Sequence, residues 1–163
     1  MDIRIGNGID FHKLKAGENL VLGGIEINSP IGTVAYSDGD VLIHALVDSI
    51  LGALSLGDLG TYFPTGDKRW KNADSMLFLT FANNKIKELG YKLLNADITI
   101  VLQSPSLKSY NKKIRIKLSS LCNIELNQVS LKATTTDNLG FLGRREGIAA
   151  FITTLLIQDE NSN

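Results

Sequence analysis

AYSDGDVLIHALVDSILGAL, residues 35–54, carries apolar side chains at nearly every position from Val41 onward. This density predicts a buried helix that starts in the YSDGD segment and continues to about Ser55. Ser37 is expected to cap the first turn, with Asp40 three residues later as a variant of the capping box. A helix that is apolar on so many sides belongs in the interior of a fold.

Three polar side chains, Asp40, His44 and Asp48, interrupt this helix at steps of four. Residues four apart lie on one helix face, so the three form a single stripe. Asp40 is explained by the helix start, because a carboxylate in the first turn offsets the helix dipole. The stripe could simply face water. The apolar side chains in most other directions favour an internal site instead, with His44 as a ligand and Asp48 fixing its tautomer.

Composition and charge restrict the class of protein. The 163 residues are 44% hydrophobic and 21% charged, which is typical of a globular protein and fits one domain over residues 1–163. No apolar run approaches the roughly 18 residues of a membrane-spanning helix. The 17 basic and 17 acidic side chains cancel, so neither nucleic acid nor a membrane is an expected partner. The N-terminus shows no signal or transit pattern, which predicts a cytoplasmic location, or an organelle stroma if a leader has been removed.

Cysteine and histidine are scarce. Cys122 is the only cysteine, which excludes an intrachain disulfide and a zinc cluster built on cysteines. It lies in the apolar stripe of a predicted helix and is expected to be a core residue. The histidines are His12 and His44, so an imidazole-based site must use these two.

Apolar periodicity and turn residues predict an α+β fold: a mixed β-sheet with about three helices packed on one face. Residues 58–72 read as a loop, and the last predicted strand has a helix as its alternative. The predicted strands are 2–12, 19–27, 33–36, 95–103, 129–136 and 147–157, and the further helices are 74–89 and one marked by Tyr110, Ile114, Leu118 and Leu121.

The segment IDFHKL places Asp10 and His12 two residues apart in a predicted strand, so both side chains leave the same face. A carboxylate and an imidazole in this arrangement can bind one cation, and His44 is the remaining imidazole. One Asp and two His suit zinc or a similar transition metal, with a coordination position left open. Taken alone, an Asp-x-His pair is usually structural.

A second polar concentration is KATTTDNLGFLGRREG, residues 132–147. Threonine hydroxyls and backbone amides can surround phosphate oxygens, Arg144 or Arg145 can add charge, and Asp137 can hold a divalent cation. The spacing of a Walker loop is absent. An ordinary turn with exposed threonines is the alternative.

Five segments together resemble the 2-C-methyl-D-erythritol 2,4-cyclodiphosphate synthase family, in the same order and from about residue 3 to residue 156. They are GNGIDFHKL, GGIEI, SDGDVLIHALVDSILGALSLGDLGTYFP, NADS and KATTTDNLGFLGRREGIAA. The resemblance is to the single-function form, without an appended cytidylyltransferase domain. It implies a homotrimer with active sites between subunits, and a small-molecule cytidine diphosphate substrate. It also implies CMP-releasing cyclisation in non-mevalonate isoprenoid precursor synthesis.

The resemblance also assigns residues. Asp10, His12 and His44 match the zinc ligands, and Thr135 matches a threonine that stabilises the transition state. Asp137 stands where the family has a Glu that binds a second divalent ion, magnesium or manganese, on the diphosphate. The positions implied to contact substrate or to lie near the trimer axis are Asp10, His12, Ser37, Asp58, Gly60, Phe63, Asp67, Thr134, Asp137, Phe141 and Arg144.

Three positions depart from the family pattern. Tyr36 replaces a histidine that stabilises the transition state, and its phenol can donate a hydrogen bond but cannot carry positive charge. Thr65 replaces a loop carboxylate. Ser106 replaces the lysine of the nucleotide loop, with Lys108 two residues late.

Two other functions are open on the sequence alone. A zinc-dependent phosphoesterase would use the same three metal ligands. A non-catalytic trimer that binds isoprenoid diphosphates is compatible with the changes at Tyr36 and Thr65.

Overall fold

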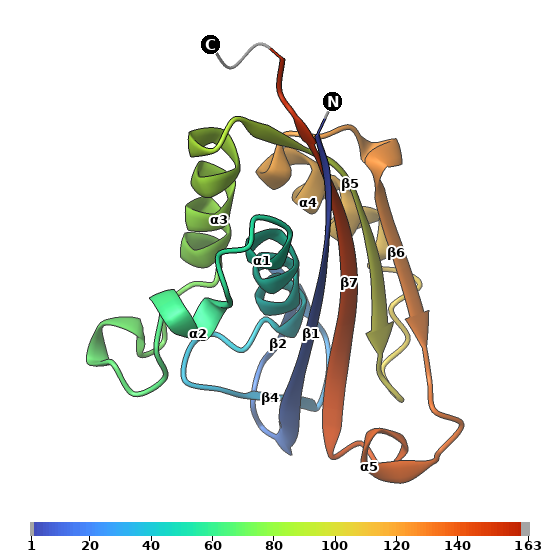
Figure 1. The fold of residues 1–163 in the computed structure, drawn as a ribbon. Helices are drawn as coiled ribbons and strands as arrows, with labels where there is room; N and C mark the ends of the chain where they lie inside the picture. Colours follow the sequence, from blue (N-terminus) through green and yellow to red (C-terminus); the bar gives the residue numbers. More distant parts are fainter. Residues whose placement is uncertain (1, 161–163) are drawn as a thin grey trace.

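A five-stranded mixed sheet is the largest unit of the computed structural model, which describes residues 2–160 (Figure 1). The strand order is β4-β1-β7-β5-β6, and β5–β6 is the parallel pair among antiparallel neighbours. The predicted strand at 147–157 is confirmed, and its helical alternative is wrong. The bounds are β1 Ile3–Ala16, β4 Ile31–Val34, β5 Tyr91–Val101, β6 Val129–Thr134 and β7 Gly147–Gln158.

Three helices pack on one face of this sheet (Figure 1). α1 (Val41–Ala53) packs against β1 and β7, α3 (Met76–Glu88) against β5, and α4 (Asn111–Cys122) against β6. The predicted α+β class is therefore confirmed. Cys122 packs against the core, and burial raises the pKa of its thiol to about 12. Within residues 2–160, none of the helices combines the length and apolar character needed to cross a membrane.

Several predicted boundaries differ in the structure, and the strand expected at 33–36 is β4, at Ile31–Val34. The strand expected at 19–27 is a hairpin of two strands, and β1 continues past residue 12 because its last residues pair with β4. The loop expected at 58–72 contains two single turns of helix, each capped by an aspartate side chain rather than marked by apolar periodicity. The shorter elements are β2 Leu20–Leu22, β3 Ile25–Ile27, α2 Leu59–Tyr62, η1 Lys68–Trp70, η2 Leu126–Gln128 and α5 Gly140–Gly143.

Asp40, not Ser37, caps α1. Its Oδ1 accepts hydrogen bonds from the Ile43 amide at 3.1 Å and the Gly23 amide at 3.0 Å, and its Oδ2 accepts from the Gly24 amide at 2.7 Å. Burial raises the pKa of this fully buried carboxyl to about 6, although the three amides oppose the shift. Asp40 thus ties the β2–β3 turn to the start of α1, a tertiary contact that the local capping pattern does not contain.

Gly6 and Gly8 let α1 lie directly on β1. A Cβ at Gly8 would stand 1.8 Å from the carbonyl oxygen of Ala45, and one at Gly6 would stand 1.8 Å from that of Ser49. No side chain fits between the two backbones at these points. The backbone of α1 therefore packs directly against the backbone of β1. His44 precedes Ala45 on α1 and so lies next to this contact.

The opposite face of the sheet carries exposed apolar side chains. Alternation along β1 sends its odd-numbered residues to this face, and β7 adds Phe151 beside Ile9. Large apolar side chains gathered on one open sheet face commonly mark an interaction surface. The exposed members are Ile3 at 51%, Ile5 at 65%, Ile9 at 54%, Phe11 at 49% and Phe151 at 38%.

Gly8→Ala is expected to lower the free energy of unfolding by about 3 kcal/mol or more, because the methyl group must push two backbones apart. Gly52→Ala is the matched control: it lies on α1, and the nearest atom to its Cβ is the Asn7 carbonyl oxygen at 3.9 Å. That change is expected to be neutral or to stabilise by up to about 1 kcal/mol, as alanine does in a helix. Urea denaturation measures both, and equal effects of the two substitutions would contradict the close contact.

Candidate active site

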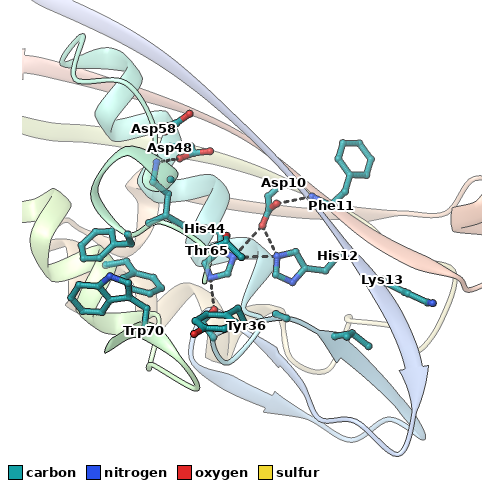
Figure 2. Close-up of a pocket in the computed structure, with 17 residues that line it drawn as sticks. Asp10, Phe11, His12, Lys13, Tyr36, His44, Asp48, Asp58, Thr65 and Trp70 are labelled. Carbon is teal, nitrogen blue, oxygen red and sulfur yellow. Dashed lines mark hydrogen bonds and ion pairs between the residues drawn. The ribbon is translucent and has the colours of Figure 1, made fainter. Parts of the chain in front are cut away.

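Three potential metal ligands meet between β1 and α1. Asp10 and His12 leave the same face of β1, and His44 comes from α1 (Figure 2). Asp10 Oδ2 lies 2.9 Å from His12 Nε2 and 3.2 Å from His44 Nδ1, and the two ring nitrogens are 3.2 Å apart. The ligand atoms all lie within 4.8 Å of one another, so the predicted cluster forms.

The electrostatics of the cluster suit a cation. Burial acts to raise the pKa of Asp10, but its interactions with His12 and His44 outweigh burial and hold that pKa well below its ordinary value. Asp10 is therefore a carboxylate, and two ring nitrogens converge on the same point. One carboxylate oxygen and two imidazole nitrogens form a ligand set that zinc and similar divalent metals accept.

The predicted role of Asp48 is wrong. Its Oδ1 accepts a hydrogen bond from the Leu59 amide at 2.7 Å, which holds the start of α2 against α1. The outward nitrogen of His44, Nε2, instead lies 2.9 Å from Ser75 Oγ and 3.2 Å from Ser37 Oγ. Spacing along α1 could not identify Ser75, because it belongs to a segment 31 residues away.

A cavity of about 420 Å³ opens beside the three ligands (Figure 2). Tyr36 and Ser37, from the segment between β4 and α1, form part of the cavity wall. Asp48 also lines the cavity, and burial raises the pKa of its carboxyl. The predicted site residues that the cavity brings together are Asp10, His12, Tyr36, Ser37, His44, Asp58, Gly60 and Phe63.

The loop after α2 closes one side of this cavity through aromatic contacts. The Phe63 ring packs 4.6 Å from Phe78 and 5.0 Å from Trp70, measured between centroids. Phe78 and Trp70 also line the cavity, and sequence reasoning missed both because only their contacts distinguish them from core residues. Asp67, a predicted substrate contact, is not among the lining residues and instead pairs with Arg69, 2.6 Å from Oδ2 to Nη2.

Thr134 and Thr135 line a different cavity, of about 530 Å³, at the ends of β5 and β6. Pro105, Ser106 and Lys108 form its other wall. Thr135 Oγ1 accepts a hydrogen bond from the Asp137 amide at 3.3 Å, and the Asp137 side chain is exposed beyond it. The threonine segment therefore forms a second polar site next to the predicted nucleotide loop.

Phe141 and Arg144 follow this segment and lie outside both cavities' linings. The Phe141 ring is 6.2 Å from the Phe11 ring on the open face of the sheet. Arg144 forms a two-point ion pair with Glu146, at 2.8 Å and 3.1 Å.

The two cavities lie at the same end of the sheet but toward opposite edges. The pairing register aligns Phe11, Ala149, Val101 and Thr134 in one row across β1, β7, β5 and β6. Three strand spacings of about 4.8 Å place the outer strands of this row about 14 Å apart. Within residues 2–160 of one chain, the cluster on β1 and the threonines of β6 therefore do not share a cavity.

Sequence comparison identifies close relatives over nearly the full chain. A model of the YgbB family matches residues 3–157. A relative from Nostoc sp. named 2-C-methyl-D-erythritol 2,4-cyclodiphosphate synthase is 45% identical over 160 residues, covering 98% of this chain and 97% of the relative. A relative of the same name from Francisella philomiragia is 48% identical, covering 96% and 99%.

Solved structures agree with the sequence relatives. The structure described as IspF of Plasmodium falciparum in complex with CDP has a TM-score of 0.86 at 38% identity, covering 97% of each chain. The bifunctional IspDF from Campylobacter jejuni has a TM-score of 0.91 at 40% identity, and this chain spans 42% of its length. The chain therefore belongs to the YgbB family, together with the 2-C-methyl-D-erythritol 2,4-cyclodiphosphate synthases, and is a lyase-type enzyme of that family.

Proposed function

We propose that residues 1–163 form one catalytic domain that cyclises 4-diphosphocytidyl-2-C-methyl-D-erythritol 2-phosphate to 2-C-methyl-D-erythritol 2,4-cyclodiphosphate and releases CMP. This would serve non-mevalonate isoprenoid precursor synthesis in the cytoplasm or an organelle stroma. The observation that carries the proposal is the convergence of Asp10, His12 and His44 beside a polar cavity. The shared name of the relatives supports the substrate.

Asp10, His12 and His44 would hold zinc or a similar divalent ion, through Oδ2, Nε2 and Nδ1. Bound there, it supplies positive charge to phosphate oxygens. Asp137 would hold a magnesium or manganese ion that arrives with the substrate diphosphate. Its exposed carboxylate follows the threonine segment, where hydroxyls and amides can meet phosphate oxygens.

The chemistry needs no activated side-chain nucleophile, since the attacking phosphate belongs to the substrate. An oxygen of the 2-phosphate bonds to the β-phosphorus, and the bond from that phosphorus to the oxygen of CMP breaks. The protein must bend the substrate so that the two groups meet, a proximity effect. Tyr36 and Ser37, which line the cavity beside His44, would donate hydroxyl hydrogen bonds to the substrate there, and Thr135 would donate one at the other cavity.

The cytidine half of the substrate would occupy the cavity between Thr134–Thr135 and the loop at Pro105–Ser106. Two solved relatives are described with CDP bound, which supports a cytidine nucleotide as the ligand. The phosphates would then extend toward Asp10, His12 and His44 of another subunit.

The proposed assembly is a homotrimer, and the same geometry supports it. The open sheet face exposes Ile3, Ile5 and Ile9, and the cavities lie at opposite edges of one sheet end. Three copies with these faces turned inward would bury the apolar side chains and bring the β6 edge of one copy to the β1 edge of the next. Each complete active site would then contain both cavities.

Ile9→Asp is expected to break this assembly, because it places a charge on the face that the copies bury. Light scattering coupled to size exclusion should show three chains of 17.8 kDa for the wild type and one chain for the variant. Ile116→Asp, on α4 at 48% exposure and away from the sheet face, should stay trimeric. A wild-type monomer would contradict the proposed trimer.

Incubation with the cytidyl substrate and Mg²⁺ is expected to release CMP and to give a cyclic diphosphate by phosphorus NMR. Removal of zinc and magnesium with a chelator should abolish turnover, and returning both ions should restore it.

The same experiment separates the rival functions. A ring-opened diphosphate would indicate a phosphoesterase, and substrate binding without turnover would indicate a binding protein. Full activity after complete metal removal would contradict the metal-dependent mechanism.

Tyr36→His is expected to preserve or raise kcat/KM, if position 36 contributes only a hydrogen-bond donor to the transition state. Tyr36→Phe, which keeps the ring and removes the hydroxyl, should lower kcat by about 10-fold or more. Steady-state assays of CMP release measure both. A large loss in Tyr36→His would show that the phenol belongs to a rearranged site.

A further inference from the structure

The outward side of His44 is contacted by Ser75, which is in turn hydrogen-bonded to Asp38, and neither of these two residues is among those that line the cavity. Ser75 Oγ lies 2.9 Å from His44 Nε2, and Ser75 is fully buried. The Ser75 hydroxyl makes a short hydrogen bond to Asp38 Oδ1, and the Ser75 amide donates to Asp38 Oδ2 at 2.9 Å. One residue thus contacts the imidazole with its oxygen and the carboxylate with both of its polar groups.

The hydrogens of this chain of contacts can be assigned by counting donors and acceptors. Asp38 Oδ1 also accepts from the Asp40 amide at 3.2 Å, so both carboxylate oxygens already face backbone donors. The Ser75 hydroxyl must therefore donate its hydrogen to Asp38. Its oxygen then offers lone pairs alone to His44 Nε2, which must carry a hydrogen. The lone pair of a neutral His44 is then left on Nδ1, 3.2 Å from both Asp10 Oδ2 and His12 Nε2, and the hydrogen between these atoms comes from His12 Nε2, which lies 2.9 Å from Asp10 Oδ2.

Two features of the backbone indicate that this arrangement is specific. Ser75 occupies the N-cap position of α3, where serine normally accepts a hydrogen bond from the helix, yet it makes no side-chain cap bond. The segments that carry the two residues are also joined by backbone bonds, from the Asp38 amide to Ala73 at 3.1 Å and from the Asn72 amide to Tyr36 at 2.8 Å. The Ser75 hydroxyl therefore contacts His44 instead of capping α3. The backbone bonds between the two segments fix its position relative to Asp38.

Ser37 is the competing partner of the same nitrogen. Its Oγ is farther away, at 3.2 Å, and it lines the cavity. Among residues 2–160, no carboxylate is hydrogen-bonded to its hydroxyl. In the described part of the chain, Ser37 therefore lacks the hydrogen-bonded carboxylate that orients the hydrogen of Ser75, and it cannot select a tautomer in the same way.

We infer that Asp38 and Ser75 are positioning residues that hold His44 in the tautomer with hydrogen on Nε2, so that Nδ1 is presented as a metal ligand. This inference rests on the proposed metal site. Groups of this kind behind a ligating histidine typically change metal affinity by 10- to 100-fold when removed.

Zn²⁺ affinity is the first readout, measured by competition with a chromophoric chelator on the full chain. Ser75→Ala and Asp38→Asn are each expected to bind Zn²⁺ about 10- to 100-fold more weakly than the wild type. In Asp38→Asn, the side-chain NH2 group replaces one carboxylate oxygen and therefore faces a hydrogen-bond donor, either the Ser75 amide or the Ser75 hydroxyl and the Asp40 amide. Either orientation breaks a hydrogen bond that holds Ser75. Ser49→Ala is the matched control, because Ser49 is an equally buried serine on α1 that donates to the Leu46 carbonyl. Its Zn²⁺ affinity should not change.

The tautomer itself is the second readout and needs no metal and no variant. Long-range proton–nitrogen NMR of the metal-free wild type, at a pH where His44 is neutral, should show the hydrogen on Nε2. A hydrogen on Nδ1, or wild-type Zn²⁺ affinity in a folded Ser75→Ala or Asp38→Asn, would overturn the inference. Failure of the wild type to bind Zn²⁺ would instead remove the proposed metal site, and the inference with it. Circular dichroism of each variant shows whether it has folded. If neither Ser75→Ala nor Asp38→Asn folds, the tautomer measured by NMR in the wild type decides whether the inference holds.

Discussion

The contact between α1 and β1 is the constraint on which the rest of the structure depends. Two glycines of the strand let the helix backbone approach so closely that a methyl group at either position would collide with a carbonyl oxygen. The same approach puts His44 within 3.2 Å of both Asp10 and His12. Fold and site therefore share one interaction, since the distance that packs the core also sets the separation of the three ligands.

Much of this arrangement could be predicted from local patterns. Period two along β1 placed Asp10 and His12 on one face, and the scarcity of histidine pointed to His44. The strand at the C-terminus, the mixed sheet and the three helices followed from apolar periodicity. These features depend on neighbours within a few positions, which a sequence displays directly.

Features that depend on distant contacts could not be predicted in this way. Ser37 and Asp40 are both acceptable caps, and the amides of the β2–β3 turn favour Asp40. Asp48 was the natural candidate to orient His44, but Ser75 approaches from α3 and Asp48 instead holds the start of α2. Nothing in the local pattern distinguishes such residues from ordinary helix-end serines and surface aspartates.

The position of the two cavities at opposite edges of one sheet end has a genetic consequence. In the proposed ring, a lesion in the β1 cluster and a lesion in the β6 threonine segment damage different halves of an active site. When a chain with the β1 lesion and a chain with the β6 lesion are expressed together, they would assemble mixed rings. In these rings, the intact β6 segment of the first chain would meet the intact β1 cluster of the second and complete an active site. Such alleles would complement each other, whereas two alleles damaged on the same edge would not.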